Sequence, residues 1–300
     1  MDNPKVSIVI LNWNGKKDTI ECLDSLKKIT YTNYEVILVD NGSTDGSVEC
    51  LKQLCSGIEF IENEKNLGCA EGNNVAVRRA VERGTDYVLL LSNDTVVHPN
   101  FLTELVNVLK NDSSIGIVGP TVYYYSIKDR IQSAGGRICW YRGQTPHFTN
   151  KDDIKFSQTR DVDYIMGCAL LARSELFKKI GYINKDYFAY WEETDWCARA
   201  KKAGYRIVHV PTAKIWHKGE ATSKKISGFY EYHMTRNMFW FMKTNAAPKQ
   251  YLSFLIYFFG FQFWLSSAIH ILYYKNITAY RSFLKGIEDG TKKSGIVSQL

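Results

Sequence analysis

The sequence lacks the motifs that mark several common protein classes. Its seven cysteines are odd in number and none forms a Cys-x-x-Cys pair, which argues against a zinc ribbon or a redox dithiol and favours reduced thiols in a cytosolic compartment. Neither Gly-x-Gly-x-x-Gly nor a Walker A motif occurs, so neither standard phosphate-binding loop is expected. No signal peptide is expected either, because residues 1–5 are polar and the apolar run that follows is too short.

Positive charge is concentrated in one stretch. Eight of the 38 Lys and Arg residues lie between Arg199 and Lys225, against the single acid Glu220, and this stretch accounts for the net charge of +7. The sequence therefore predicts no nucleic-acid-binding surface, but one local basic patch that faces phosphate groups. With 45% apolar residues, the 300-residue chain can form one large domain with an appendage, or two domains.

Residues 251–274 contain no Asp, Glu, Lys or Arg. At about 1.5 Å per residue, a helix of this length crosses the hydrocarbon core of a bilayer. The alternative is a helix buried in a second core, but the segment is aromatic throughout and shows no polar stripe. Basic residues flank both ends, and Gly260 and Gln262 interrupt the middle, where a helix could break. We therefore favour a helical pair that lies in or dips into the cytoplasmic face of the cell membrane over a single crossing.

Short apolar runs alternate with helical patterns through the first half of the chain. Strands are expected over residues 6–11, 35–39, 58–61, 86–91 and 115–118, and helices over 16–28, 45–54, 70–83 and 100–109. Strands separated by helices of this length predict an α/β fold with a parallel sheet covered on both faces.

After Pro120 the alternation stops. Residues 121–160 are typical of hairpins or ordered loops, and they precede expected elements at 163–171 (strand), 174–180 (helix), 194–203 (helix) and 206–210 (strand, ended by Pro211). From about residue 228 the chain is helical and aromatic. We therefore expect a sheet domain over residues 1–225 and a helical, membrane-associated tail over 226–300.

Polar residues follow three of the expected strands: Asn12, residues 40–45 and residues 92–94. A turn or a helix cap accounts for any one set, but three sets at one sheet edge predict a ligand site. Asp94 is a hard oxygen ligand suited to Mg²⁺ or Mn²⁺ that bridges phosphates. His217 also follows a short apolar strand, where a structural histidine is the commoner case unless a metal is near.

Three acids, Glu192, Glu193 and Asp195, stand close together between Trp191 and Trp196 at the start of an expected helix. Acids at this place also stabilise a helix N-terminus, which is the structural alternative. Two adjacent carboxyl groups among large aromatics should have raised pKa values from desolvation and mutual repulsion. That is the property a general base requires.

Six collinear segments resemble one known family: SIVILNWNG, VILVDNGSTDGS, NLGCAEGNN, LLLSNDT, MGCALLARSELFKKIGYIN and YFAYWEETDWCARAKKAGYRIVHVPTAKIWHKG. Over residues 5–245 the chain resembles the family 2 glycosyltransferases, and within them the rhamnosyltransferase-like branch that builds cell-surface polysaccharides. The resemblance implies a GT-A fold, which is α/β with a Rossmann-like open mixed sheet and helices on both faces. It also implies inverting transfer of a sugar from a UDP- or dTDP-linked donor to a hydroxyl group of a saccharide or lipid-linked acceptor.

The resemblance assigns roles to individual residues. Asp40 matches the carboxylate that reads the pyrimidine ring, with Asn12 beside the base, and the other donor-side positions are Asn41, Gly68, Gly72, Asn73 and Asn93. Asp94 matches a ligand of Mg²⁺ or Mn²⁺, and His217 resembles an additional ligand of the metal or of the diphosphate. The acceptor-side positions are Gly167, Arg173, Trp191 and Asp195.

Two positions depart from the family pattern. The metal motif, Ser92-Asn93-Asp94, has one carboxylate where the family has two. Glu193 aligns with the catalytic base, but the family's Glu-Asp pair is Glu192-Glu193 here, which leaves the base open between them.

Two other functions share parts of this pattern. A membrane-tethered protein that binds nucleotide sugars without turnover would need no base, and the Glu192-Glu193 pair argues against it. A nucleotidyltransferase would need a glycine-rich, basic loop after the first strand, where this chain has Asn12–Gly15.

Overall fold

The computed structural model describes residues 3–55, 57–149, 158–219 and 226–292. The strands of these residues form one ten-stranded sheet, whose main path runs β3-β2-β1-β4-β9-β6-β10-β5. The first four are parallel and match the expected strands closely: β1 (Val6–Asn12), β2 (Tyr34–Asp40), β3 (Glu59–Glu62) and β4 (Tyr87–Ser92). The helices between and after them are α1 (Lys16–Leu26), α2 (Ser47–Leu54), α3 (Gly68–Glu82) and α4 (Phe101–Asn111).

The second half of the sheet is mixed. Here β9 (Ala169–Arg173) is antiparallel to both β4 and β6 (Ile115–Tyr124), while β10 (Arg206–His217) is parallel to β6. Three short strands complete the sheet, β5 (Thr95–Val97) and β8 (Arg160–Asp161) beside β10, and β7 (Ile131–Ser133) beside β6. The helices of this half are α5 (Ser174–Ile180), the 3₁₀ turn η1 (Lys185–Tyr187) and α6 (Glu192–Lys202).

Pro120 and Pro211 both lie inside strands, although Pro211 was expected to end one. Pro120 sits in β6 between the pairing with β9, which ends at Val118, and the pairing with β7, which begins at Val122. Pro211 sits in β10 where the register against β6 shifts between Val210 and Lys214. A proline with no ladder partner for its missing N–H is tolerated at such a gap or bulge. The strand expected over 163–171 was also wrong in extent, because it begins only at Ala169.

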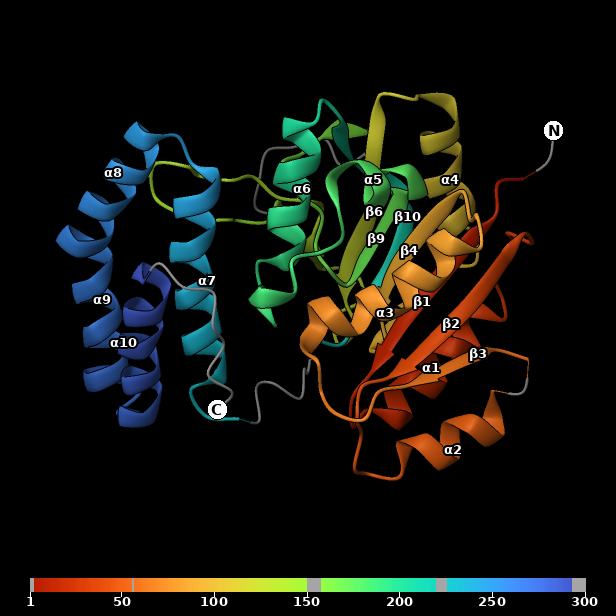
Figure 1. Ribbon diagram of the computed structural model, residues 1–300, viewed down its shortest axis with the longest axis horizontal. Coiled ribbons are helices and arrows are strands. Elements are labelled where there is room, and N and C mark those ends of the chain that lie inside the picture. Colours follow the sequence, from red (N-terminus) through yellow and green to blue (C-terminus); the bar gives the residue numbers. More distant parts are fainter. Residues whose placement is uncertain (1–2, 56, 150–157, 220–225, 293–300) are drawn as a thin grey trace.

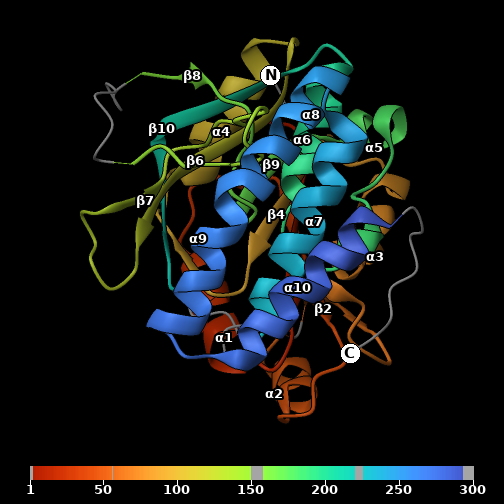
Figure 2. The ribbon, with the colours of Figure 1, turned by 90° about the vertical axis from the view of Figure 1, so that its left-hand side faces the viewer.

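The C-terminal helices form a layer beside the sheet domain (Figure 1). Helix α7 (Phe229–Asn245) is followed by one long helical segment, α8 (Pro248–Tyr257), η3 (Phe258–Gln262), α9 (Phe263–Ala268) and η4 (Ile269–Tyr273), and then by α10 (Ile277–Thr291). Figure 2 shows α7, α9 and α10 side by side in this layer. The expected break at Gly260 and Gln262 is wrong, because the chain continues there as a π-helical turn and reverses only at Lys275, which has a positive φ of 50°.

Helix α7 is part of the same core as the sheet domain. Phe239, Phe241 and Met242 are fully buried and belong to one hydrophobic cluster with Trp191 and Trp196. The expected domain boundary at residue 225 falls at residues 220–225, outside the described part of the chain, so the division stays a prediction. The packing shows that α7 supports the loop that precedes α6.

The segment Pro248–Tyr273 is the one helix in the described residues that is long and apolar enough to cross a membrane, with a mean hydropathy of 1.5 over its best window. One face of this segment packs inward, and its side chains Phe254 and Phe258 are buried. The opposite face exposes large apolar side chains, among them Ile256, Phe261 and Trp264. Such a face suits contact with a lipid surface.

Candidate active site

A cavity of about 390 Å³ opens at the carboxyl ends of β1 and β4. Residues from the β1–α1 loop, the β4–β5 turn, the starts of α3 and α6, and the end of β10 line it. Nine of the residues singled out in the sequence are among them: Asn41, Gly68, Asn73, Asn93, Asp94, Gly167, Glu192, Glu193 and His217. The structure therefore brings the expected donor, metal and base positions together at one sheet edge.

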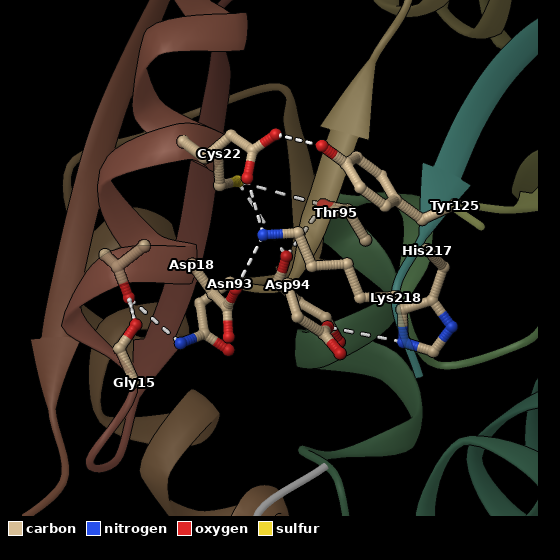
Figure 3. Close-up of polar contacts among 12 residues, drawn as sticks. Gly15, Asp18, Cys22, Asn93, Asp94, Thr95, Tyr125, His217 and Lys218 are labelled. Atoms are coloured by element: carbon tan, nitrogen blue, oxygen red, sulfur yellow. Dashed lines mark hydrogen bonds and ion pairs between the residues drawn. The ribbon is translucent and has the colours of Figure 1, made fainter. Parts of the chain in front are cut away.

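Asp94 and His217 meet because β5 pairs with the end of β10. Thr95 is the register partner of His217, and the backbone N–H of Lys218 donates to the carbonyl of Asp94 at 3.0 Å. The two side chains then face each other, with Asp94 Oδ1 3.3 Å from His217 Nε2 (Figure 3). Burial opposes ionisation of Asp94, but the hydrogen bond and charge of His217, together with backbone hydrogen bonds, outweigh it and lower the pKa of this carboxyl.

The donor set fits a divalent cation. His217 Nδ1 lies 3.0 Å from the amide oxygen of Gln132, an arrangement that leaves Nε2 directed at Asp94. A histidine that binds a metal through one ring nitrogen usually donates the N–H of its other ring nitrogen to a carbonyl oxygen or a carboxylate. In the described residues no group of three or more His, Cys, Asp or Glu side chains could hold an ion. Asp94 and His217 would therefore supply two ligands and leave the others to substrate and water. Gln132 was not predicted as a site residue from the sequence, because a lone glutamine belongs to no recognisable motif.

Glu192 and Glu193 form the first turn of α6, which begins two residues earlier than expected. The residues before them are backbone outliers, since Phe188, Tyr190 and Trp191 have φ values of 63°, 66° and 72°. Three non-glycine residues with positive φ are costly, and such strain gathers at functional sites. This loop turns both carboxyl groups into the cavity.

Burial raises the pKa of both carboxyl groups. For Glu193 desolvation is the largest cause and the charge of Glu192 adds to it, while backbone hydrogen bonds from Glu193, Thr194 and Gly167 act in the opposite direction. For Glu192 desolvation again dominates. The side chain of Glu193 lies against Gly167. If residue 167 carried a Cβ atom, that atom would lie 3.5 Å from the carboxyl carbon of Glu193. The raised pKa values agree with the expectation from the sequence.

Cys69 is a site residue that the sequence did not reveal. It lines the cavity, its thiol hydrogen-bonds to Glu192, and its pKa is raised by burial and by the charge of that carboxyl. Glu192 Oε2 has no partner among the described residues. Both carboxyl groups accept backbone N–H hydrogen bonds, and Glu192 alone has the thiol of Cys69 as a further partner.

Asn12 and Asp40 lie behind the cavity wall. Both are fully buried, and Asn12 Nδ2 donates to Asp40 Oδ2 at 2.7 Å while the backbone N–H of Ser43 donates to Oδ1 at 2.8 Å. Asp40 does not line the cavity, so its expected role in reading the ring stays a prediction. Asn93 joins the network through Nδ2, which lies 3.3 Å from Asn12 Oδ1.

Asn41 lines the cavity but its amide is also engaged. Nδ2 donates to Asn66 Oδ1 at 2.9 Å and Oδ1 accepts from the backbone N–H of Leu67 at 3.1 Å. Asn41 thus fixes the loop before α3. The partly exposed aromatic Trp13 lines the same cavity and was not singled out in the sequence.

Two glycines allow close approaches around α3. A Cβ on Gly68 would lie 2.6 Å from the ring of Phe188, and Gly68 has a φ of +80°. A Cβ on Gly72 would lie 2.8 Å from Leu11. Gly68 lines the cavity, whereas Gly72 serves the packing of α3 on β1.

Three expected acceptor-side residues do not line this cavity. Arg173 lies at the opposite end of the sheet beside Tyr87, where its guanidinium donates to the backbone carbonyl of Ile115 at 2.7 Å, which corrects its placement. Asp195 is buried and pairs with Arg199 at 2.8 Å, so it holds α6 in place. Trp191 faces a second cavity, described below.

The basic stretch does not form the expected patch. Arg199, Lys201 and Arg206 each pair with an acid outside the cavity lining, and Lys224 and Lys225 lie outside the described residues. Lys218 lies beside Asp94, yet its Nζ contacts Asp18 at 2.6 Å and Glu21 at 2.5 Å (Figure 3). The excess charge of this segment is offset by acids from other parts of the chain.

Comparison with known proteins gives matches in sequence and in structure. The family described as Glycosyl transferase family 2 matches residues 7–181. The dTDP-rhamnosyl transferase RfbF of Shigella flexneri is 23% identical over 268 residues, which cover 82% of this chain and 82% of that protein. The N-acetylglucosaminyl-diphospho-decaprenol L-rhamnosyltransferase of Mycobacterium tuberculosis is 26% identical over 215 residues, which cover 65% of this chain and 70% of that protein.

Among solved structures, the fold resembles a mannosyltransferase, PcManGT from Pyrobaculum calidifontis, in complex with GDP-Man and Mn²⁺. The TM-score is 0.62 at 16% identity, and the match covers 98% of this chain and 89% of that one. The likeness confirms the GT-A fold expected from the sequence.

Proposed function

The chain belongs to the family 2 glycosyltransferases, and from this premise we propose that it transfers a sugar with inversion from a UDP- or dTDP-linked donor to a hydroxyl group of a lipid-linked saccharide. Its family and relatives identify it as a glycosyltransferase that uses nucleotide sugar donors in glycan biosynthesis. The stereochemistry, the nucleotide and the acceptor are the proposed parts.

The observation that carries the proposal is the half-buried Glu193, with a raised pKa, in the same cavity as Asp94 and His217. An acceptor hydroxyl is too weak an acid to attack unaided, so a carboxylate must take its proton as the new bond forms. In one displacement, the acceptor oxygen bonds to the anomeric carbon, the bond from that carbon to the diphosphate breaks, and the proton passes to Glu193. A single displacement inverts the configuration.

Asp94 and His217 would together hold Mg²⁺ or Mn²⁺ against the donor diphosphate. The chemistry that a divalent ion would supply there is neutralisation of the charge on the leaving diphosphate. Backbone N–H groups at the start of α6 and at Gly167 favour the ionised form of Glu193 and partly offset desolvation, but the pKa stays raised, to about 8, so the base is ionised toward the alkaline side of neutral pH. Glu192 is the alternative base, with Cys69 as its hydrogen-bond partner.

A lipid-linked acceptor is favoured by two observations. The relative from M. tuberculosis is named for a decaprenol-linked substrate. This chain also carries an exposed apolar face on Pro248–Tyr273, next to the catalytic domain. Because nucleotide sugars are cytosolic, we place the enzyme on the cytoplasmic face of the cell membrane.

The test compares Glu193→Gln with its matched neighbour Glu192→Gln in the full-length protein. UDP- and dTDP-sugars are screened with Mn²⁺, and release of nucleoside diphosphate and donor Kd are measured. Glu193→Gln should lower kcat at least about 100-fold, the usual weight of a general base, with donor Kd nearly unchanged. Near-normal turnover of Glu193→Gln together with a loss in Glu192→Gln would reverse the assignment. Full turnover in both variants would remove the base mechanism.

A further inference from the structure

A second cavity, of about 860 Å³, lies between the tail helices and the loop of residues 142–146. That loop reaches from the sheet domain to the tail, where Gln144 Nε2 donates to the hydroxyl of Tyr257 at 3.2 Å. Helix α7 forms one wall and the segments η3, α9, η4 and α10 form the other. No role in the reaction described above uses this space.

The two cavities share a wall. Trp191 lines the second cavity and the next residue, Glu192, lines the first. The same holds at the start of α7, where Phe229 lines the first cavity and Tyr230 the second. Tyr190 closes this wall with its ring 5.3 Å from that of Tyr230. A ligand that occupies the second cavity therefore lies next to the carboxyl groups of α6.

The second cavity contains polar groups without partners. The side chain of Trp191 is 5% exposed, and its indole N–H has no hydrogen-bond partner among the described residues. His270 Nδ1 is likewise buried and without a partner there. An indole N–H is a donor only, and a buried donor without an acceptor is destabilising. Arg142, exposed at the rim over the ring of Tyr257, adds a positive charge.

The rest of the lining combines polar side chains, among them the acid Glu231, with an apolar stretch. Met234 and Met238 of α7 face Phe258 and Phe283 across the space. Thioether side chains adapt to flexible hydrocarbon chains. The helix that carries Phe258 exposes its other face to the outside as the apolar surface described above. A hydrocarbon chain held here would thus have a lipid-compatible surface beside it.

We propose that the second cavity binds the lipid-proximal part of the acceptor, a prenyl chain together with the diphosphate that joins it to the sugar. The inference rests on the proposed function and deepens it. The diphosphate oxygens accept from the Trp191 indole N–H and pair with Arg142 at the rim. The prenyl chain lies along Met234, Met238 and Phe283, and the sugar lies at the Tyr190–Tyr230 wall, on whose other side are the carboxyl groups of α6.

The test is a binding measurement that needs no turnover. Farnesyl diphosphate is titrated into the full-length protein by calorimetry in excess EDTA, so that a metal-held diphosphate in the first cavity does not contribute. Two variants fill the cavity from opposite walls, Ser266→Phe in α9 and Met238→Trp in α7. Leu265→Phe is the matched control, because this neighbouring side chain is 43% exposed and does not line the cavity.

Each filling variant should lower the affinity for farnesyl diphosphate at least 10-fold, and the control should bind it with the affinity of the wild-type protein. Trp191→Phe, which keeps the ring and removes the N–H, should weaken it several-fold. Wild-type affinity in both filling variants would place the ligand elsewhere. Equal displacement by inorganic diphosphate would refute the prenyl part, and equal displacement by dodecyl maltoside would refute the diphosphate part.

The filling variants stand on different helices, so either one carries the test if the other fails to fold by circular dichroism. The outcome is also separable from that of the proposed function. Donor turnover without farnesyl diphosphate binding would overturn this inference alone, whereas binding without any donor turnover would overturn the proposed function.

Discussion

The side-chain amide of Asn237 in α7 donates to the backbone carbonyl of Tyr190 at 2.8 Å. The same Nδ2 lies 2.9 Å from the carbonyl of Tyr187 and 2.7 Å from that of Ala189. Asn237 is fully buried, and the loop it holds contains the residues with positive φ that precede Glu192. The tail therefore fixes the backbone from which both candidate bases project.

Replacing Asn237 by alanine should slow transfer without abolishing donor binding. The loop carbonyls lose their donor, which costs about 1–3 kcal/mol, and the carboxyl groups of α6 lose their fixed position. We expect kcat to fall about 10-fold or more, with a lower melting temperature and a donor Kd within a factor of three. Thr244→Ala, an exposed change in the same helix, is the control. An Asn237→Ala enzyme with wild-type kcat would show that the loop holds its shape unaided.

The pH dependence of transfer should report the buried carboxyl pair. A base must be ionised to accept a proton, and the pKa of Glu193 is raised above its ordinary 4.5 by desolvation and by Glu192. The acidic limb of kcat/KM should therefore lie above the usual carboxyl range, with activity increasing as pH increases through it. Glu192→Gln should move this limb to lower pH, because it removes the neighbouring charge. A limb near 4.5 in the wild-type enzyme would contradict the raised pKa.

The same shift predicts how stability depends on pH. Since the folded-state pKa is raised above the unfolded value, this group's stabilisation is complete below about 4.5 and is lost as pH rises through the folded pKa. Glu193→Gln, which cannot ionise, should therefore melt a few degrees higher than wild type at pH 8. The difference should shrink toward pH 4.5. A variant that melts lower than wild type at pH 8 would indicate that the charge is compensated.

Metal affinity should depend on a residue that does not touch the ion. The amide oxygen of Gln132 fixes the ring of His217 by contacting its Nδ1 atom. Gln132→Leu should therefore lower the affinity for Mn²⁺ about 10–100-fold, as is usual when the hydrogen-bond partner of a metal-binding residue is removed. His217→Ala should weaken it further, and EDTA should abolish transfer. Mn²⁺ affinity is measured by electron paramagnetic resonance in the presence of UDP or dTDP. Gln144→Leu, in the second cavity, is the matched control and should bind Mn²⁺ as wild type.

Much of the site could be predicted from the sequence because parallel strands bring their carboxyl ends to one edge. Asn93, Asp94 and the acids of α6 reached the same cavity for this reason and through the family resemblance. The start of the strand before Arg173 was misplaced, and the residue itself lies at the far end of the antiparallel β9. Strand direction in the second half is set by pairing with β4 and β6, which local patterns do not encode.

The partners of charged side chains and the burial of polar ones were harder to predict from the sequence. The sequence showed where the lysines and arginines lie but not their partners, so Arg206, which pairs with Asp112 and Asp161, was assigned to a phosphate-binding patch. Asp40 was expected at the ligand because it ends a strand. Its side chain instead points toward Asn12, the residue opposite it in β1. Such long-range partners follow from the fold and not from the neighbours in the chain.

The nucleotide base should be held by Trp13 and not by Asp40. Trp13 is the partly exposed aromatic of the β1–α1 loop that lines the cavity, and stacking of a base on an aromatic ring contributes about 1–3 kcal/mol. Trp13→Ala should weaken UDP or dTDP about 5–100-fold by calorimetry, and Trp13→Phe should weaken it less. Asp40→Asn should lower the melting temperature, since an amide cannot accept from both Asn12 and Ser43. A larger loss of affinity in Asp40→Asn than in Trp13→Ala would restore the carboxylate to the binding site.

The exposed face of Pro248–Tyr273 should bind the full-length protein to lipid vesicles. Ile256, Phe261 and Trp264 are 66%, 54% and 66% exposed, and burying a side chain of this kind in an apolar phase contributes about 1.5–3 kcal/mol. Replacing all three with serine should lower co-flotation with vesicles that contain anionic lipid at least about 100-fold. The control is the pair Leu54→Ser and Ile127→Ser, which are equally exposed but lie on the sheet domain. Equal flotation of both variants would show that this helix is not the membrane contact.

The helix should lie along the membrane surface and not cross it. Its other face is fixed to the catalytic domain, with the ring of Phe258 4.6 Å from that of Phe239 in α7, and a crossing would pull this contact into lipid. The turn at Lys275 follows the helix, and α10 returns to pack on α7. A cysteine at Lys275 should therefore react with an impermeant maleimide from the same side of sealed vesicles as one at Lys110 in α4, above the background of the native thiols. Reaction of the two positions from opposite sides would establish a true crossing.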